Sequence, residues 1–108
     1  MSNYATGARI ERLARDVLRR YGYYVVRSAG SKGAFDLVAW NKDEIKFIQC
    51  KKVGAWSKAD LEKMVKVPIP CIDGVMELWE WDGSGDWQVH WFDPYNEVWD
   101  RRSGTGLK

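Results

Sequence analysis

Three residues at two predicted strand ends carry groups that suit a divalent cation and a phosphate. Asp36 lies at the start of one apolar stretch, and Gln49 and Lys51 lie near the end of the next. Because Gln49 and Lys51 are two residues apart in a predicted strand, their side chains lie on the same strand face. If the two stretches pair as a hairpin, Asp36 lies opposite Gln49. Carboxylate and amide oxygens bind hard cations such as Mg²⁺, and a neighbouring ammonium stabilises developing negative charge. The group therefore suits metal-assisted hydrolysis of a phosphodiester.

A fourth candidate, Glu11, lies on a predicted helix. It precedes apolar members of the same helical face by three and seven residues, so its carboxylate follows the apolar stripe. A carboxylate that faces a core needs an ionic partner or a metal. The residues leave two interpretations open, an ion pair with Arg12 or Arg15 and membership of the site around Asp36. The presence of Asp36, Gln49 and Lys51 favours the second.

The elements that position these residues follow from apolar periodicity. Apolar residues recur at helical spacing over residues 10–21, and Gly22 is expected at the C′ position after this amphipathic helix. Ser57 is the expected N-cap of a second helix that ends before Pro68. Five stretches rich in β-branched and aromatic residues predict strands: residues 23–28, 35–40, 45–53, 74–81 and 87–92.

The order α-β-β-β-α-β-β predicts an α/β fold with a central mixed sheet flanked by helices. The 108 residues suit a single domain spanning residues 1–108. Residues 101–108 are expected to form a flexible tail.

The composition is that of a globular protein, with 45% hydrophobic and 30% charged residues, and it excludes the disordered class. The charge is uneven along the chain. Residues 1–67 hold 14 Lys/Arg and 7 Asp/Glu, a net +7, whereas residues 68–108 hold 3 and 8, a net −5. A basic part beside an acidic part suits a polyanion that approaches from one side. A solvated helix surface would give the same pattern.

Membrane and zinc-binding classes are not expected. No apolar run approaches the roughly 20 residues that span a bilayer, and the N-terminal residues do not resemble a signal peptide. We therefore expect a cytoplasmic protein, and a chain of this size would also suit a small viral genome. Cys50, Cys71 and His90 cannot form a zinc pattern. Both thiols are expected to be reduced and buried, and His90 to lie on a strand away from catalysis.

Four segments together resemble the archaeal-type Holliday junction resolvases of the PD-(D/E)xK nuclease superfamily: residues 7–12, 22–31, 36–39 and 48–52. In that family a helix glutamate, a loop serine, a strand aspartate and a Glu-x-Lys pair build the active site. The resemblance assigns these roles to Glu11, Ser31, Asp36, Gln49 and Lys51. It implies a restriction-endonuclease-like fold, with Glu11, Asp36 and Gln49 as ligands of Mg²⁺, for which Mn²⁺ would substitute.

The sequence departs from the family pattern at two positions. Phe35 precedes Asp36 where proline is usual, and Gln49 replaces the glutamate, which removes one negative charge from the metal site. Gln-x-Lys is the form found in Mrr-type restriction endonucleases, which residues 49–51 also resemble. The choice between a four-way junction and ordinary duplex DNA therefore stays open at this point.

Phosphate contacts are expected from basic and hydroxyl side chains of the same half. The glycine-containing loop 29–34 permits a close approach to the DNA backbone, and binding through phosphates should depend strongly on salt. The candidates are Arg9, Arg12, Arg19, Arg27, Ser31, Lys32 and Lys52.

Tryptophans crowd the last third of the chain, and a small core can hardly bury all seven that the sequence contains. Aromatic residues are enriched in interface cores, so we expect a homodimer built partly on the last strands. The alternative is a tryptophan-rich core with partial exposure. The residues concerned are Trp79, Trp81, Trp87, Trp91 and Trp99.

The leading hypothesis is a metal-dependent endonuclease that resolves four-way DNA junctions. The first alternative is an Mrr-like endonuclease that cuts duplex DNA. The second is a DNA-binding module that kept the fold and lost catalysis through Gln49.

Overall fold

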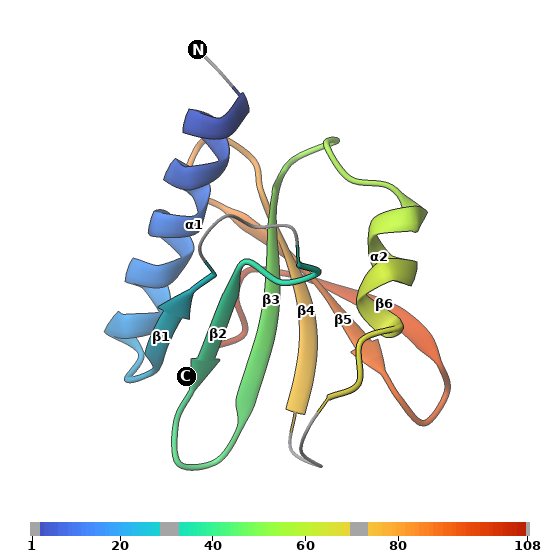
Figure 1. Ribbon diagram of the computed structural model, residues 1–108. Coiled ribbons are helices and arrows are strands. Elements are labelled where there is room, and N and C mark those ends of the chain that lie inside the picture. The colour runs from blue at the N-terminus through green and yellow to red at the C-terminus, as the bar shows by residue number, and fades with distance from the viewer. Residues whose placement is uncertain (1–2, 29–32, 70–73, 108) are drawn as a thin grey trace.

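The computed structural model describes residues 3–107 apart from 29–32 and 70–73 (Figure 1). Within them the chain runs α-β-β-β-α-β-β-β. The helices are α1 (Asn3–Arg20) and α2 (Lys58–Val65). The strands are β1 (Tyr24–Arg27), β2 (Leu37–Trp40), β3 (Ile45–Lys52), β4 (Gly74–Trp81), β5 (Trp87–Asp93) and β6 (Val98–Ser103).

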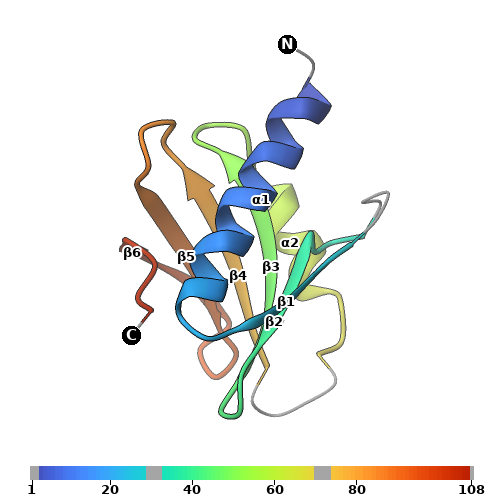
Figure 2. The ribbon, with the colours of Figure 1, turned by 90° about the vertical axis from the view of Figure 1, so that its left-hand side faces the viewer.

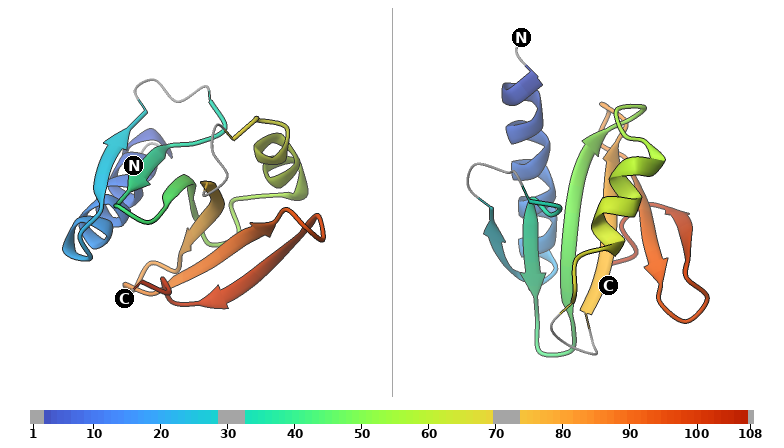
Figure 3. Two further views of the ribbon diagram at one scale, coloured as in Figure 1. Left: turned by 90° about the horizontal axis from the view of Figure 1, so that it is seen from below. Right: turned by 45° about the vertical axis from the view of Figure 1, so that its right-hand side comes forward.

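The six strands form one sheet in which each strand lies beside its neighbours in sequence. β3 and β4 are parallel, and every other neighbouring pair is antiparallel. The predicted mixed sheet is therefore confirmed. The two helices cover opposite faces of this sheet (Figures 2 and 3). α1 packs on β1, β2 and β3, and α2 packs on β4.

The end of α1 shows why the chain turns into β1. Gly22 N–H donates to the Arg19 carbonyl at 3.1 Å, and Tyr23 N–H donates to the Leu18 carbonyl at 3.1 Å. These are the two bonds of a Schellman motif, which needs a left-handed residue at C′. Gly22 supplies it with φ +88°. The predicted C′ glycine is confirmed.

α2 begins where predicted, with Ser57 as its N-cap in extended backbone. The Ser57 N–H donates to the Asp60 carboxylate at 2.8 Å, the acidic half of a capping box. The helix ends at Val65, two residues before the predicted end.

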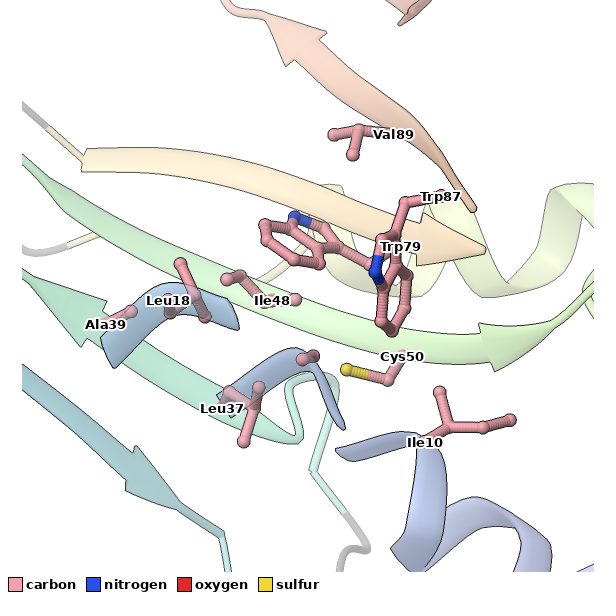
Figure 4. Packing of buried hydrophobic residues seen from close by; sticks show 10 residues of the cluster. Ile10, Leu18, Leu37, Ala39, Ile48, Cys50, Trp79, Trp87 and Val89 are labelled. Atoms are coloured by element: carbon pink, nitrogen blue, oxygen red, sulfur yellow. The ribbon is translucent and has the colours of Figure 1, made fainter. Parts of the chain in front are cut away.

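Apolar side chains fill both faces of the sheet. On the α1 face, Ile10, Ala14 and Leu18 pack against residues from β2 to β5, including the fully buried Trp79 (Figure 4). On the other face, Leu61 and Met64 of α2 pack against β4. Helix α1 thus rests on strands from both halves of the chain.

The sixth strand corrects the predicted tail. Residues 101–103 lie in β6, so the expectation of a flexible segment from residue 101 is wrong there. The Arg102 guanidinium pairs with the buried Glu77 carboxylate at 3.2 Å, and Leu107 packs against the core of the α1 face. Most residues of Val98–Ser103 are exposed and polar, so this strand has no apolar pattern by which the sequence could predict it.

The tryptophans of the last strands divide between core and partly exposed positions. Trp79 and Trp87 are buried with their rings 5.3 Å apart, and Trp81, Trp91 and Trp99 are partly buried. The alternative, a tryptophan-rich core with partial exposure, describes these residues. The homodimer stays a prediction. Cys50 is a buried free thiol as expected, and Cys71 lies outside the described residues.

Neither helix in the described part of the chain is long and apolar enough to cross a membrane.

Candidate active site

Asp36 lies directly before β2 and is 5% exposed. Its N–H donates to the Ile48 carbonyl at 2.8 Å, and its Oδ2 accepts the Cys50 N–H at 2.9 Å. Leu37 pairs with Ile48 in the antiparallel β2–β3 register. One further step along this register brings Asp36 opposite Gln49, as the hairpin prediction requires.

The Asp36 carboxylate is held in a setting that disfavours its charge. Burial raises its pKa above the usual value, and this outweighs the opposing effects of the Cys50 N–H and of the Lys51 and Arg27 charges. The influence of Lys51 on this pKa shows that its ammonium lies within electrostatic range of Asp36.

Glu11 of α1 joins the same group. Burial is the main cause that raises its pKa, and the nearby charge of Asp36 is the second. The helix acid and the strand acid therefore repel one another across the interface between α1 and the sheet. This proximity agrees with the placement of Glu11 in the site of Asp36.

Glu11 has an ionic partner, but not one of those considered from the sequence. Arg27 at the end of β1 approaches Glu11 Oε1 at 3.4 Å through both Nε and Nη2. Arg15 instead pairs with Asp16 at 3.2 Å. The partner was missed because strand β1 folds back along α1, which helical spacing cannot reveal.

Gln49 and Lys51 share one face of β3, as predicted from alternation. Both are half-buried, whereas Ile48 and Cys50 are buried on the α1 face between them. Cys50 contributes through its backbone N–H, a role that the sequence analysis did not assign. The only available signal was its position between Gln49 and Lys51.

The donor set fits a hard divalent cation. The buried Asp36 carboxylate and the partly buried Glu11 carboxylate both have raised pKa values and lie close together, and a cation between them would offset both their desolvation and their repulsion. Among the described residues, no third carboxylate, histidine or thiol completes a metal-binding cluster with them. The remaining ligands would be the Gln49 amide oxygen and water, which a hard cation accepts.

The predicted DNA-binding residues fall into four groups. Arg9, Arg12 and Lys52 are exposed, and the Arg9 guanidinium lies 5.3 Å from the centre of the Trp81 ring. Arg27 lies beside Glu11 at the site. Arg19 is in the last turn of α1, about 12 Å further along the helix axis than Glu11. Ser31 and Lys32 lie outside the described residues.

A hollow of about 560 Å³ lies at the other end of the sheet. Its charged groups satisfy one another: Lys46 Nζ donates to Glu77 at 2.9 Å and lies 3.4 Å from Glu44. Arg102 also donates to Glu77. This is a buried ion-pair network, and its Lys46 lies three residues before Gln49 on β3 and on the opposite face of the sheet.

Comparisons with known proteins agree on one family. Residues 2–66 match the family described as archaeal Holliday junction resolvase (hjc). Over 66 residues the chain is 38% identical to the crossover junction endodeoxyribonuclease Hjc of Methanocaldococcus jannaschii. That match covers 57% of this chain and 49% of the relative, so the chain spans about half the length of the curated relative it matches.

The fold is similar to a solved structure of Hjc from Archaeoglobus fulgidus, a Holliday junction resolvase of an archaeal hyperthermophile. The TM-score is 0.63 at 22% sequence identity, and the match covers 78% of this chain and 70% of the other. This likeness confirms the predicted α/β architecture with its mixed central sheet.

Proposed function

Since the chain belongs to the archaeal Holliday junction resolvase family, we propose that it is a metal-dependent endonuclease that resolves four-way DNA junctions. The observation that carries this proposal is the convergence of the buried Asp36 carboxylate and the partly buried Glu11 carboxylate on the strand end that bears Gln49 and Lys51.

Each residue of the site has a distinct part in this proposal. Asp36, Glu11 and Gln49 would hold Mg²⁺, with Mn²⁺ as a substitute. When bound, the ion supplies charge to the phosphate and lowers the pKa of an attacking water. The Cys50 N–H fixes the orientation of the Asp36 carboxylate. Lys51 places a positive charge where the phosphate gains negative charge during hydrolysis.

Arg27 provides a further positive charge at the site. Its long contacts of 3.4 Å with Glu11 leave the guanidinium a third exposed, so a phosphate could replace the carboxylate as its partner. Ser31, assigned by the family resemblance, would approach the DNA backbone from the loop before Asp36. Lys32, next to Ser31 in sequence, would approach the DNA backbone with it. Exposed Arg9, Arg12 and Lys52 would contact neighbouring phosphates, and Arg19 a phosphate farther along the DNA.

A junction resolvase must cut two strands, and one chain carries one such site, so the proposal includes a homodimer. We place its interface on the sheet face opposite α1, over β1 and β2. Tyr24 and Val26 are 70% and 54% exposed there, and the Tyr24 ring stacks on Trp40 with centroids 6.0 Å apart.

Sedimentation of a Tyr24→Ser/Trp40→Ser variant should give the monomer mass. A dimer of unchanged affinity would exclude this face.

The decisive experiment compares cleavage of a four-way junction with cleavage of a linear duplex of the same sequence, with Mg²⁺ and with Mn²⁺. We expect cleavage of the junction and little cleavage of the duplex. Asp36→Asn should retain binding and lose cleavage.

Two other outcomes would favour the alternatives. Comparable cutting of both DNAs would support an Mrr-like duplex endonuclease, to which the Gln49-x-Lys51 pattern points. Tight binding with no cleavage under either metal would support a DNA-binding module that lost catalysis. Normal cutting by Asp36→Asn would overturn the site itself.

A further inference from the structure

A second buried carboxylate lies beside the catalytic strand. Glu80 of β4 is 8% exposed and pairs in the parallel register with Lys51 of β3. Residues paired in this way point to the same face of a sheet. Glu80 lies beyond residues 2–66, which match the family, so the comparisons do not assign it a role.

The oxygens of Glu80 are occupied by the loop that follows β3. Its Oε2 accepts the Gly54 N–H at 3.3 Å and the Trp56 Nε1–H at 2.5 Å. Its Oε1 lies 3.6 Å from His90 Nε2, and the His90 ring packs edge-on against Trp56 at 4.6 Å. Burial alone would raise the pKa of Glu80, but the hydrogen bonds from Trp56 and Gly54, together with the contact to His90, lower it below its usual value and favour the ionised carboxylate.

These contacts hold a tight turn immediately after the catalytic residues. Ala55 N–H donates to the Lys52 carbonyl at 3.0 Å, and Gly54 occupies the third turn position with φ +76°. Val53 N–H donates to the Trp81 carbonyl at 2.9 Å, which fastens the turn to the end of β4. The turn therefore has two attachments to β4, one through the backbone and one through Glu80.

We propose that Glu80 is a positioning residue for Lys51: it fixes the turn of residues 52–55 and thereby the strand end that carries the ammonium. The inference rests on the nuclease function proposed above. Lys51 forms no ion pair with any described residue. Its position is therefore set by its backbone. A displacement of about 1 Å at a reacting group can lower a rate roughly 100-fold.

The test compares Glu80→Ala with Glu80→Gln. Single-turnover cleavage is measured with saturating junction, and junction affinity is measured with Ca²⁺ in place of Mg²⁺. Glu80→Ala should slow cleavage roughly 10- to 100-fold with affinity unchanged within about twofold. Glu80→Gln should recover most of the rate, because its amide oxygen still accepts from Gly54 and Trp56. A loss of affinity without loss of rate would contradict positioning.

Two controls separate positioning from general loss of stability. Glu77→Gln alters another buried carboxylate of the same strand, which points to the opposite face of the sheet and pairs with Lys46, and it should lower the melting temperature without slowing cleavage. In a Lys51→Ala background, Glu80→Ala should cause no further loss, because both changes remove the same contribution. Additive losses, or an equal slowing by Glu77→Gln, would overturn the proposal.

Amide hydrogen exchange tests the structural part without any cleavage. The amides of residues 53–56 should exchange faster in Glu80→Ala than in the wild type, and not faster in Glu77→Gln. Unchanged exchange in Glu80→Ala would refute the role of Glu80 even in an active nuclease. If the Glu80→Ala amides exchange faster but the wild type cuts no DNA, the role of Glu80 in the turn would be supported and the proposed nuclease function would be refuted.

Discussion

At the scale of single residues, the candidate site holds two carboxylates in surroundings that favour their neutral forms over their charged forms. Asp36 is buried and Glu11 is partly buried, and each has a raised pKa. Groups with a raised pKa in the folded state stabilise the fold below their unfolded pKa, and that contribution is lost as pH rises. Without a bound cation, neutral pH therefore costs this protein stability. Binding of a cation would recover it.

Neutralising Asp36 tests this cost. Asp36→Asn keeps an oxygen that can accept the Cys50 N–H and removes the charge. In the presence of a chelator at pH 7, we expect the variant to have a higher melting temperature than the wild type. Each 1 kcal/mol by which loss of the charge stabilises the fold should raise the melting temperature by about 4–8 °C. The difference should shrink as pH falls towards 4. Mg²⁺ should raise the melting temperature of the wild type more than that of the variant. A variant less stable than the wild type at pH 7 would contradict the assignment.

Restoring the family's glutamate at position 49 tests the metal site from the other direction. Gln49→Glu adds a third negative charge beside Asp36. Half-maximal cleavage should need a metal concentration lower by about tenfold, equivalent to about 1.4 kcal/mol of tighter binding. The metal-free melting temperature should fall because like charges repel. Titration of cleavage rate against Mg²⁺ measures the first effect. An unchanged titration would place Gln49 outside the ligand set.

At the scale of elements, local backbone signals set the boundaries that matter. Gly22 ends α1 with a positive φ, which lets Tyr23 begin the return along the helix and brings Arg27 back to Glu11. The geometry of the site therefore depends on a helix end about 10 residues away in sequence.

Two glycine substitutions in the same helix region should have opposite effects. Gly22→Ala forces an L side chain into left-handed backbone and should destabilise the fold by about 1 kcal/mol. Gly7→Ala lies within α1 with open space around the new methyl group and should stabilise by about 0.5–1 kcal/mol. Urea denaturation of the two variants measures both. Equal signs would contradict the Schellman assignment.

Much of the element order could be predicted from the sequence because apolar alternation and caps are local signals. The hairpin that brings Asp36 opposite Gln49 followed from strand lengths and one turn. Three features could not be predicted. The Arg27 partner of Glu11 depends on tertiary folding, the edge strand β6 lacks an apolar pattern, and the Glu80–Gly54 contact requires the parallel pairing of β3 with β4. The choice of core over interface for the tryptophans depends on which sheet faces are covered.

At the scale of the whole molecule, the order of strands separates the basic and acidic parts of the chain onto two sides of the sheet. Residues 1–67 carry a net +7 and residues 68–108 a net −5. Because each strand lies beside its sequence neighbours, β1 to β3 occupy one side of the sheet and β4 to β6 the other. The positive side includes the strands that hold the candidate site residues, and this charge favours approach of a polyanion there.

The salt dependence of the affinity for DNA shows which positively charged side chains contact DNA phosphates. Arg12→Ala and Lys52→Ala should each reduce the slope of log affinity against log salt by about 0.9, since each removes one phosphate contact. Lys42→Ala, an exposed lysine in the turn between β2 and β3, serves as a control and should leave the slope unchanged. Fluorescence anisotropy over a range of KCl concentrations measures the slopes. A reduction in the Lys42 variant equal to the others would argue for a diffuse contact.

The parallel pairing of β3 with β4 also governs how the chain reaches its fold. All other strand pairs join neighbours through short connections, so their loop-closure cost is small. The β3–β4 pair must close over residues 53–73, and α1 completes its core only with Trp79 and Trp87 from beyond that connection. Pairs between distant residues form slowly. The Glu11 and Asp36 carboxylates lie on elements joined by short connections and can thus meet early, whereas the turn beside Lys51 gains its contact with Glu80 only once β4 has paired with β3.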